Sequence, residues 1–188
     1  MFGLGGLKLS EASAHLRPPG GQDEDRLLSA CIRCERCVET CPRAVIVPSH
    51  LEDGVLAVRT PTISFNADYC DFCNDEHAGV PRCVEACPTG ALRLPVGAEA
   101  ATTIIGKAVL TTDWCLAYEN MHCRFCFDAC PYDAITLDEY ERPVINEGAC
   151  NGCGACESVC VSLSSGALDV PMSHRAIIVV PESEANAL

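Results

Sequence analysis

The sequence has few aromatic residues, few basic residues and no long apolar run. Phe, Trp and Tyr make up 5% of its 188 residues, which is little material for an ordinary apolar core. Lys and Arg number 13 against 26 Asp and Glu, a formal net charge of −13. This balance argues against nucleic-acid binding and against docking on anionic lipid, because both need a basic face. The longest apolar run, 176–180, is far shorter than the roughly 18 residues of a membrane-spanning helix.

Cysteine, in contrast, is abundant, and its 16 residues fall into four groups of four. The first and fourth groups have the spacing C-x2-C-x2-C-x3-C, which is the run of bacterial [4Fe–4S] ferredoxins. The second and third groups keep the C-x3-C-P ending but have one longer gap, and Val161 replaces proline after the fourth group. The groups are Cys31, Cys34, Cys37 and Cys41; Cys70, Cys73, Cys83 and Cys87; Cys115, Cys123, Cys126 and Cys130; Cys150, Cys153, Cys156 and Cys160.

These spacings indicate iron–sulfur clusters. Three closely spaced thiolates can bind three corners of a cubane, while the cysteine after the x3 gap points away and reaches a neighbouring cluster. A disulfide framework gives no reason for the repeated x2 and x3 gaps, and zinc ribbons have no C-x3-C-P ending. We therefore predict four [4Fe–4S] clusters, with all sixteen cysteines as their ligands.

The groups also reveal a fourfold repeat of cluster loop, helical turn and β-hairpin. Short apolar strands are predicted after each group, and each is followed by a turn and a second strand. The first strands are 44–47, 91–94, 134–137 and 167–170, and the second strands are 55–59 (extending toward 65), 107–111, 143–145 and 175–180. A helix is predicted to begin near Asp23 and to continue through Ala30. The predicted fold class is α+β, with two ferredoxin-like dicluster modules.

Two pairings of the groups are open, sequential (first with second, third with fourth) and nested (first with fourth, second with third). The first group has no strand before it, and the strand at 175–180 is free to fill that place, so nested pairing is favoured. It predicts one module from 22–66 plus 146–180 and another from 67–145, with an apolar segment and linker at 1–21 and a tail at 181–188. The predicted ligand sets are Cys31, Cys34, Cys37 and Cys160; Cys150, Cys153, Cys156 and Cys41; Cys70, Cys73, Cys83 and Cys130; Cys115, Cys123, Cys126 and Cys87.

No active site is predicted. The sequence has no dinucleotide fingerprint and no P-loop, and its five histidines lack metal-ligand spacing. Several residues next to the cysteines could tune the reduction potential of a cluster, but a solvated surface position is favoured for them. They are Arg33, Arg36, Arg124 and His122. The rings of Tyr69 and Trp114 are expected to pack over clusters. The acidic run at 23–25 is expected to stabilise a helix start.

Three segments resemble the NapG/MauM family of ferredoxin-type proteins: Leu16–Gly20 (LRPPG), Cys31–Cys34 (CIRC) and Cys115–Tyr118 (CLAY). The resemblance covers nearly the whole chain and implies four [4Fe–4S] clusters on the sixteen cysteines. It also implies an electron relay between a membrane quinol-oxidising partner and a periplasmic acceptor. More distantly, Cys70–Ala91 resembles the electron-transfer subunits of dimethyl sulfoxide reductase and formate dehydrogenase, whose nested pairing supports the arrangement above.

The predicted function is therefore that of an electron-transfer subunit without catalysis of its own, working with redox protein partners. The alternatives are the four-cluster subunit of a molybdopterin oxidoreductase and, in a different class, an iron–sulfur sensor or assembly protein. The family implies export by the twin-arginine route, and the sequence has no Arg-Arg pair. The apolar Met1–Leu7 resembles the end of such a signal, so a periplasmic or extracytoplasmic location is favoured over a cytoplasmic one.

Overall fold

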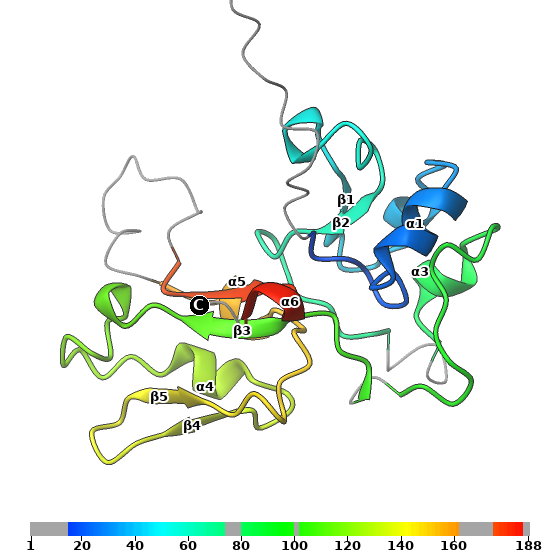
Figure 1. Ribbon diagram of the computed structural model, residues 1–188. Coiled ribbons are helices and arrows are strands. Elements are labelled where there is room, and N and C mark those ends of the chain that lie inside the picture. Colours follow the sequence, from blue (N-terminus) through cyan, green and yellow to red (C-terminus); the bar gives the residue numbers. More distant parts are fainter. Residues whose placement is uncertain (1–14, 74–79, 100–101, 162–174, 186–188) are drawn as a thin grey trace, which may run out of the picture.

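The computed structural model describes residues 15–73, 80–99, 102–161 and 175–185, which Figure 1 shows as a ribbon. Within these ranges the chain forms short helices and two-stranded antiparallel sheets, so the predicted α+β class is confirmed. None of the helices in these ranges has the length and hydropathy of a membrane span. The elements are α1 (Glu24–Ala30), α2 (Arg36–Glu39), β1 (Ile46–Pro48), η1 (Leu51–Asp53), β2 (Pro61–Ile63), α3 (Arg82–Glu85), β3 (Lys107–Leu110), η3 (Thr112–Trp114), α4 (Phe125–Ala129), β4 (Ile135–Leu137), β5 (Pro143–Ile145), α5 (Ala155–Ser158), β6 (Ile177–Val180) and α6 (Glu182–Ala185).

These elements form two modules, each made from consecutive parts of the chain. In the N-terminal module, residues 15–73 and 80–99, β1 pairs with β2 and α2 contacts α3. In the C-terminal module, residues 102–161 and 175–185, β3 pairs with β6, β4 pairs with β5, and α4 contacts α5. Figure 1 shows α1, α3, β1 and β2 on one side of the β3–β6 pair, and α4, β4 and β5 on the other.

The predicted division into 22–66 plus 146–180 and 67–145 is therefore wrong. That division depended on the last strand pairing beside the first cysteine group. Instead, β6 pairs antiparallel with β3, with Lys107 opposite Val180 and Leu110 opposite Ile177. Because β3 leads into the third cysteine group, the last strand completes the C-terminal module.

The place beside the first group is occupied by the segment 16–21, which is buried. The Leu16 carbonyl accepts a hydrogen bond of 2.8 Å from the Ile63 N–H, and the Gly20 carbonyl accepts one of 3.0 Å from the Arg93 N–H. Gly20 has a φ of +81°, and a Cβ there would lie 2.6 Å from the Arg93 nitrogen, so glycine is required. This part of the predicted linker, 1–21, belongs to the core, while residues 1–14 lie outside the described residues.

Arg17 holds the buried segment in place. Its side chain is 2% exposed and forms an ion pair with Glu24 of α1. Its Nη1 also donates to the Thr60 hydroxyl and to the Pro61 carbonyl, each over 2.9 Å. The pair with Glu24 is bidentate, since Nε and Nη2 donate to its two carboxylate oxygens. One guanidinium therefore joins the entering segment to α1 and to β2.

The predicted first helix is confirmed as α1. The Asp23 carboxylate accepts a 3.0 Å hydrogen bond from the Arg26 N–H, and so caps the helix. Glu24 and Asp25 lie in the first turn, where negative charge is favourable. Leu27 is fully buried and fixes the inner face of the helix.

The predicted hairpins are partly confirmed. β4 and β5 form the hairpin expected after the third group. After the first group, β1 pairs with β2 at Pro61–Ile63, whereas the predicted strand at 55–59 is a turn. The predicted strand at 91–94 is irregular, because β3 takes β6 as its partner. Residues 167–170 lie outside the described residues, and 182–185 form α6 where a tail was predicted.

Cysteines contribute directly to the core. The main apolar cluster includes Leu27, Phe65 and Ile177 together with buried cysteines from the second, third and fourth groups. Eight further cysteines from all four groups pack against it, whereas Cys115 and Cys123 belong to a second, smaller cluster and Cys34 is exposed. The interior is therefore arranged around sulfur, as the scarcity of aromatic residues indicated.

Candidate iron–sulfur cluster sites

All sixteen cysteines are free thiols, and the fold gathers them into four sets of four. Each set takes three cysteines from one sequence group and the last cysteine of another group. We name them set A (Cys31, Cys34, Cys37, Cys87), set B (Cys70, Cys73, Cys83, Cys41), set C (Cys115, Cys123, Cys126, Cys160) and set D (Cys150, Cys153, Cys156, Cys130).

The four cysteines of set A line one pocket next to α2. Burial raises the pKa of Cys37 to about 11, and the charges of Cys31 and Cys87 add to this effect. Cys34 is exposed, so this set lies close to the molecular surface.

The four cysteines of set B line a second pocket, together with Ile46 of β1 and Ile63 of β2. Burial raises the pKa of Cys70 to about 12, and the charge of Cys41 contributes in the same direction. Burial also raises the pKa of Cys83, as do the charges of Cys70, Cys73 and Cys41. The cysteine from the first group is thus an integral member of this set.

Sets C and D belong to the C-terminal module. The four cysteines of set D line one pocket. Burial raises the pKa of Cys153 to about 11, and the charge of Cys130 adds to this effect. In set C, the pKa of Cys126 rises to about 12, first through burial and then through the charges of Cys115, Cys160 and Cys123.

The predicted exchange of the fourth cysteines is present, but the nested pairing is wrong. Cys41, Cys87, Cys130 and Cys160 all lie in sets other than the predicted ones, and the arrangement is the sequential alternative. The physical reason is that α2 contacts α3 and α4 contacts α5. The cysteine that follows each of these short helices is delivered to the neighbouring group, not to a distant one.

The first and fourth groups share an unusual loop backbone. Arg33 and Gly152 have φ values of 57° and 78°, and Glu35 and Gly154 have 61° and 83°. The residues before the second cysteine and after it are therefore left-handed in both loops. This double bend turns three closely spaced sulfurs toward one cavity, which is the geometry that the C-x2-C-x2-C spacing predicts.

Backbone N–H groups point at several sulfurs. Burial by itself raises the pKa of Cys87, but hydrogen bonds from Leu92 and adjacent groups outweigh it, so this pKa is lowered. Such hydrogen bonds favour the thiolate and tune a bound cluster. The N–H groups of Leu92, Ala108 and Ala134 donate to Cys87, Cys150 and Cys130 over 3.4, 3.4 and 3.3 Å.

The donor sets fit [4Fe–4S] clusters. Each supplies four thiols, the ligand number such a cluster takes, and the cysteines of sets A, B and D each line a pocket together. In the described ranges, no three Cys, His, Asp or Glu side chains meet closely enough to bind a single metal ion. Four thiolates in one partly buried set repel one another, and a positively charged core removes that repulsion.

Three of the four charged or titratable residues beside the cysteines contact other protein groups, and the fourth, Arg36, is exposed. Arg33 donates to the carbonyls of Val58 and Leu56 over 2.9 and 3.1 Å. Arg124 pairs with Asp128 at 3.0 Å. The His122 side chain is 75% exposed and lies 2.9 Å from Glu141, which confirms its predicted surface position.

The two aromatic residues have different environments. Tyr69 is half-buried against the core, and the Arg43 guanidinium lies 5.0 Å from its ring centre. Arg43 is itself held by Asp71 at 2.8 Å. Trp114 is 39% exposed, at the surface next to Cys115. Packing over a cluster remains a prediction for both rings.

Sequence analysis missed the contact between sets B and D. The Cys70 N–H donates to the Cys153 carbonyl over 2.8 Å, across the boundary between the modules. Tyr132 lies beside both cysteines, with its hydroxyl hydrogen-bonded to the Asn151 side chain and its pKa raised mainly by burial. Gly154, directly after Cys153, was the available sequence signal for this close approach, because an ideal Cβ there would lie 2.3 Å from the Phe65 ring.

Comparison with known proteins agrees with these modules. The family model described as a 4Fe-4S dicluster domain matches residues 30–91 and 121–163. The first match spans the first and second cysteine groups, and the second spans most of the third group and all of the fourth. Both matches therefore follow the sequential pairing seen in the structure.

Several curated proteins are similar over most of the chain. The methylamine utilization ferredoxin-type protein MauM of Methylobacillus flagellatus is 36% identical over 169 residues, covering 85% of this chain and 69% of that protein. The ferredoxin-type protein NapG of Escherichia coli is 35% identical over 185 residues, covering 89% and 77%. The ferredoxin-type protein NapF of Escherichia coli is 32% identical over 154 residues, covering 80% and 82%. The chain therefore belongs to the MauM and NapG family of ferredoxin-type iron–sulfur electron-transfer proteins.

Proposed function

We propose that the protein holds four [4Fe–4S] clusters on sets A to D and relays single electrons between redox partners in a respiratory complex. The observation that carries this proposal is the complete use of sixteen free cysteines in four sets of four. A [4Fe–4S] cluster, when bound, supplies one-electron chemistry over a wide range of potentials.

The chain's own residues form the four cluster sites. The cysteines supply thiolates from rigid loops, and the N–H groups of Leu92, Ala108 and Ala134 stabilise the charge on three of them. No nucleophile, base or substrate site is needed for such a relay. The proposed role is accordingly that of a subunit that supports the catalysis of a partner enzyme.

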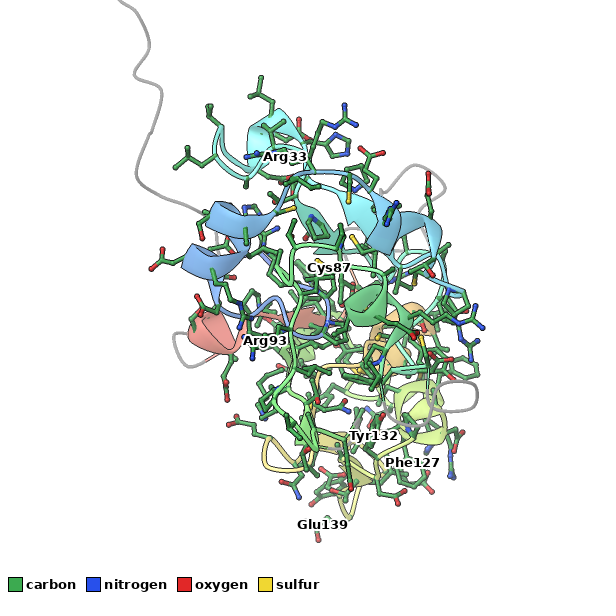
Figure 2. The ribbon with its side chains drawn as sticks, turned by 90° about the vertical axis from the view of Figure 1, so that its right-hand side faces the viewer. Arg33, Cys87, Arg93, Phe127, Tyr132 and Glu139 are labelled. Carbon is green, nitrogen blue, oxygen red and sulfur yellow. The ribbon has the colours of Figure 1, made fainter. Side chains whose placement is uncertain are left out.

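Two sets lie near exposed apolar side chains. In set A, Cys34 is exposed, and Ile32 and Leu56 beside it are 62% and 71% exposed. Near set C, Met121 and Phe125 are 60% and 55% exposed. Figure 2 shows Arg33 toward one end of the molecule and Phe127 toward the other. These surfaces are where redox partners would exclude water and approach a cluster.

The proposed partners are a membrane quinol-linked protein on one side and a redox enzyme on the other. The support is the similarity to NapG and to the methylamine utilization protein MauM, together with the net charge of −13, which favours basic or apolar docking faces. We propose an extracytoplasmic location reached through these partners. Fractionation of cells that produce the full chain tests this location, and recovery only with the cytoplasm would contradict it.

The cluster assignment is tested on anaerobically purified protein by iron and sulfide analysis and by a redox titration followed by electron paramagnetic resonance (EPR). About four reducible [4Fe–4S] centres per chain are expected, from four cysteine ligands each. Cys83→Ser should lose one centre, whereas Thr40→Ser, which introduces the same side chain beside Cys41, should keep all of them. Fewer centres in the unmodified protein would refute the ligand assignment.

The partners are tested by purification of the complex and identification of its proteins. Association with a quinol-oxidising membrane protein supports the proposal, whereas a molybdopterin subunit bound directly would favour the alternative complex. Cluster-dependent DNA binding would favour a sensor and overturn the relay.

A further inference from the structure

The two modules meet where the cysteine loops of sets B and D touch. The Cys70 N–H donates to the Cys153 carbonyl over 2.8 Å, and both residues carry sulfurs that belong to their own sets. A short route therefore leads from one sulfur to the other through one hydrogen bond and the covalent bonds of two cysteine residues.

This contact is held by close packing on both sides. The Phe65 ring, from the N-terminal module, is 2% exposed and lies where a side chain of Gly154 would be, 2.3 Å from an ideal Cβ. Arg175, from the C-terminal module, is 7% exposed and donates to the Phe65 carbonyl over 2.8 Å. The junction leaves no room for an added methyl group, so its geometry is tightly determined.

Within each module the two sets are joined in a different way. Cys41 of the first group lies in set B, and Cys87 of the second group lies in set A. Sets C and D exchange Cys130 and Cys160 in the same manner. Each module therefore contains one linked pair, and the Cys70–Cys153 contact connects the two pairs.

We propose that the Cys70–Cys153 peptide contact, positioned by Phe65, Gly154 and Arg175, is the electronic junction between the modules, and that the sets are coupled in the order A, B, D, C. This inference rests on the proposed function. Transfer across the junction moves one electron from a reduced cluster in one set to an oxidised cluster in the other. No bond forms or breaks, and no proton moves.

The test uses a pair of glycine substitutions in the full iron-loaded chain. Gly154→Ala inserts a Cβ against Phe65, whereas Gly90→Ala meets nothing within 4 Å. Both glycines have a positive φ, +83° and +66°, so both substitutions carry a similar backbone cost. Only the first should separate the modules. The double variant Gly154→Ala with Phe65→Leu makes room again and serves as the rescue.

The measurements are the magnetic interactions between reduced clusters, by EPR at increasing degrees of reduction, and the rate of electron equilibration after flash reduction. Gly154→Ala should lose the interaction between sets B and D and slow equilibration between modules, while the interactions within each module persist. Gly90→Ala should behave as the unmodified protein, and the double variant should regain the coupling.

Four clusters with an unchanged B–D interaction in Gly154→Ala would overturn the inference and leave the proposed function intact. Fewer than four clusters in the unmodified protein would overturn the proposed function itself. If Gly154→Ala loses a cluster, Arg175→Lys takes its place, because it shortens the donor to Phe65 without touching a cysteine. Unchanged coupling in Arg175→Lys would then count against the junction.

Discussion

At the scale of single residues, the cluster loops require left-handed backbone at positions that are not glycine. Ala44 and Asp133 have φ values of 52° and 50°, and Gly90, at the corresponding place after the second group, has 66°. Each lies three residues after the last cysteine of its group. A residue with a Cβ in this conformation costs about 1–2 kcal/mol, so the turn is imposed by the ligand loop.

Ala44→Gly should therefore stabilise the protein. Ala44 is exposed, so no burial is lost, and relief of the left-handed strain should gain about 1 kcal/mol, or roughly 2 °C in the unfolding midpoint. Anaerobic thermal unfolding of the iron-loaded protein measures this. Ala98→Gly, at a position outside the left-handed residues, is the control and should give no gain. A lower midpoint for Ala44→Gly would contradict the strain argument.

Arg17→Ala should have the opposite effect. It leaves Glu24 without its partner and removes the donor to Thr60 and Pro61. Glu24 is 37% exposed and regains water, so the main cost is that of the unpaired Thr60 and Pro61 acceptors in the interior. That cost is about 1–3 kcal/mol, measurable as a shift in the denaturant midpoint. Arg93→Ala, which removes an exposed side chain, should stay within about 0.5 kcal/mol. Equal shifts of the denaturant midpoint in Arg17→Ala and Arg93→Ala would show that the hydrogen bonds of Arg17 contribute little to the free energy of unfolding.

At the scale of elements, Glu157 connects α5 to β6. Its carboxylate accepts a 2.6 Å hydrogen bond from the Val179 N–H and lies 3.8 Å from Arg175. The Ala176 and Ile177 N–H groups are in turn hydrogen-bonded to Cys160. The last strand, the fourth-group helix and set C therefore form one unit.

Glu157→Ala should loosen this unit. It leaves a buried N–H and a buried guanidinium short of partners, at a cost of about 1–3 kcal/mol. Hydrogen exchange should show faster exchange in β3 and β6, with little change in β1 and β2. Glu157→Gln keeps an acceptor for the Val179 N–H and should retain most of the protection. Uniform faster exchange throughout the chain would argue against a local link.

At the scale of the whole molecule, we expect the cysteine sets to make folding depend on iron. Burial and mutual repulsion raise the pKa values of Cys37, Cys70, Cys126 and Cys153, so without a metal core the sets are unfavourable as thiolates. The strands are three or four residues long, and they bury little apolar surface by themselves.

Removal of iron by an anaerobic chelator, with reductant present, should therefore unfold the chain. Circular dichroism should show loss of both tertiary and secondary signals as the iron and sulfide leave, because metal binding and folding are linked. Reconstitution with iron and sulfide should restore them. A cluster-free chain with the same cooperative transition as the iron-loaded protein would contradict this prediction.

Much of this molecule could be predicted from residue types and local spacing. The cysteine groups, the α1 cap at Asp23 and the β4–β5 hairpin depend on neighbours in sequence, so local patterns identify them. The burial of 16–21 could not be predicted in this way, because the Leu-Arg-Pro-Pro-Gly segment is extended and finds its partners at Ile63 and Arg93, far along the chain.

The sequence by itself determined the number and identity of the candidate ligands and the α+β character, because both follow from spacing over a few residues. Only the tertiary structure decided which group receives each fourth cysteine. The choice depends on β6 pairing with β3 and on contacts between α2 and α3 and between α4 and α5. The junction at Cys70 and Cys153 was decided in the same way, since it arises where Phe65 meets Gly154 across the two modules. Long-range contacts of this kind leave no periodic trace in a single sequence.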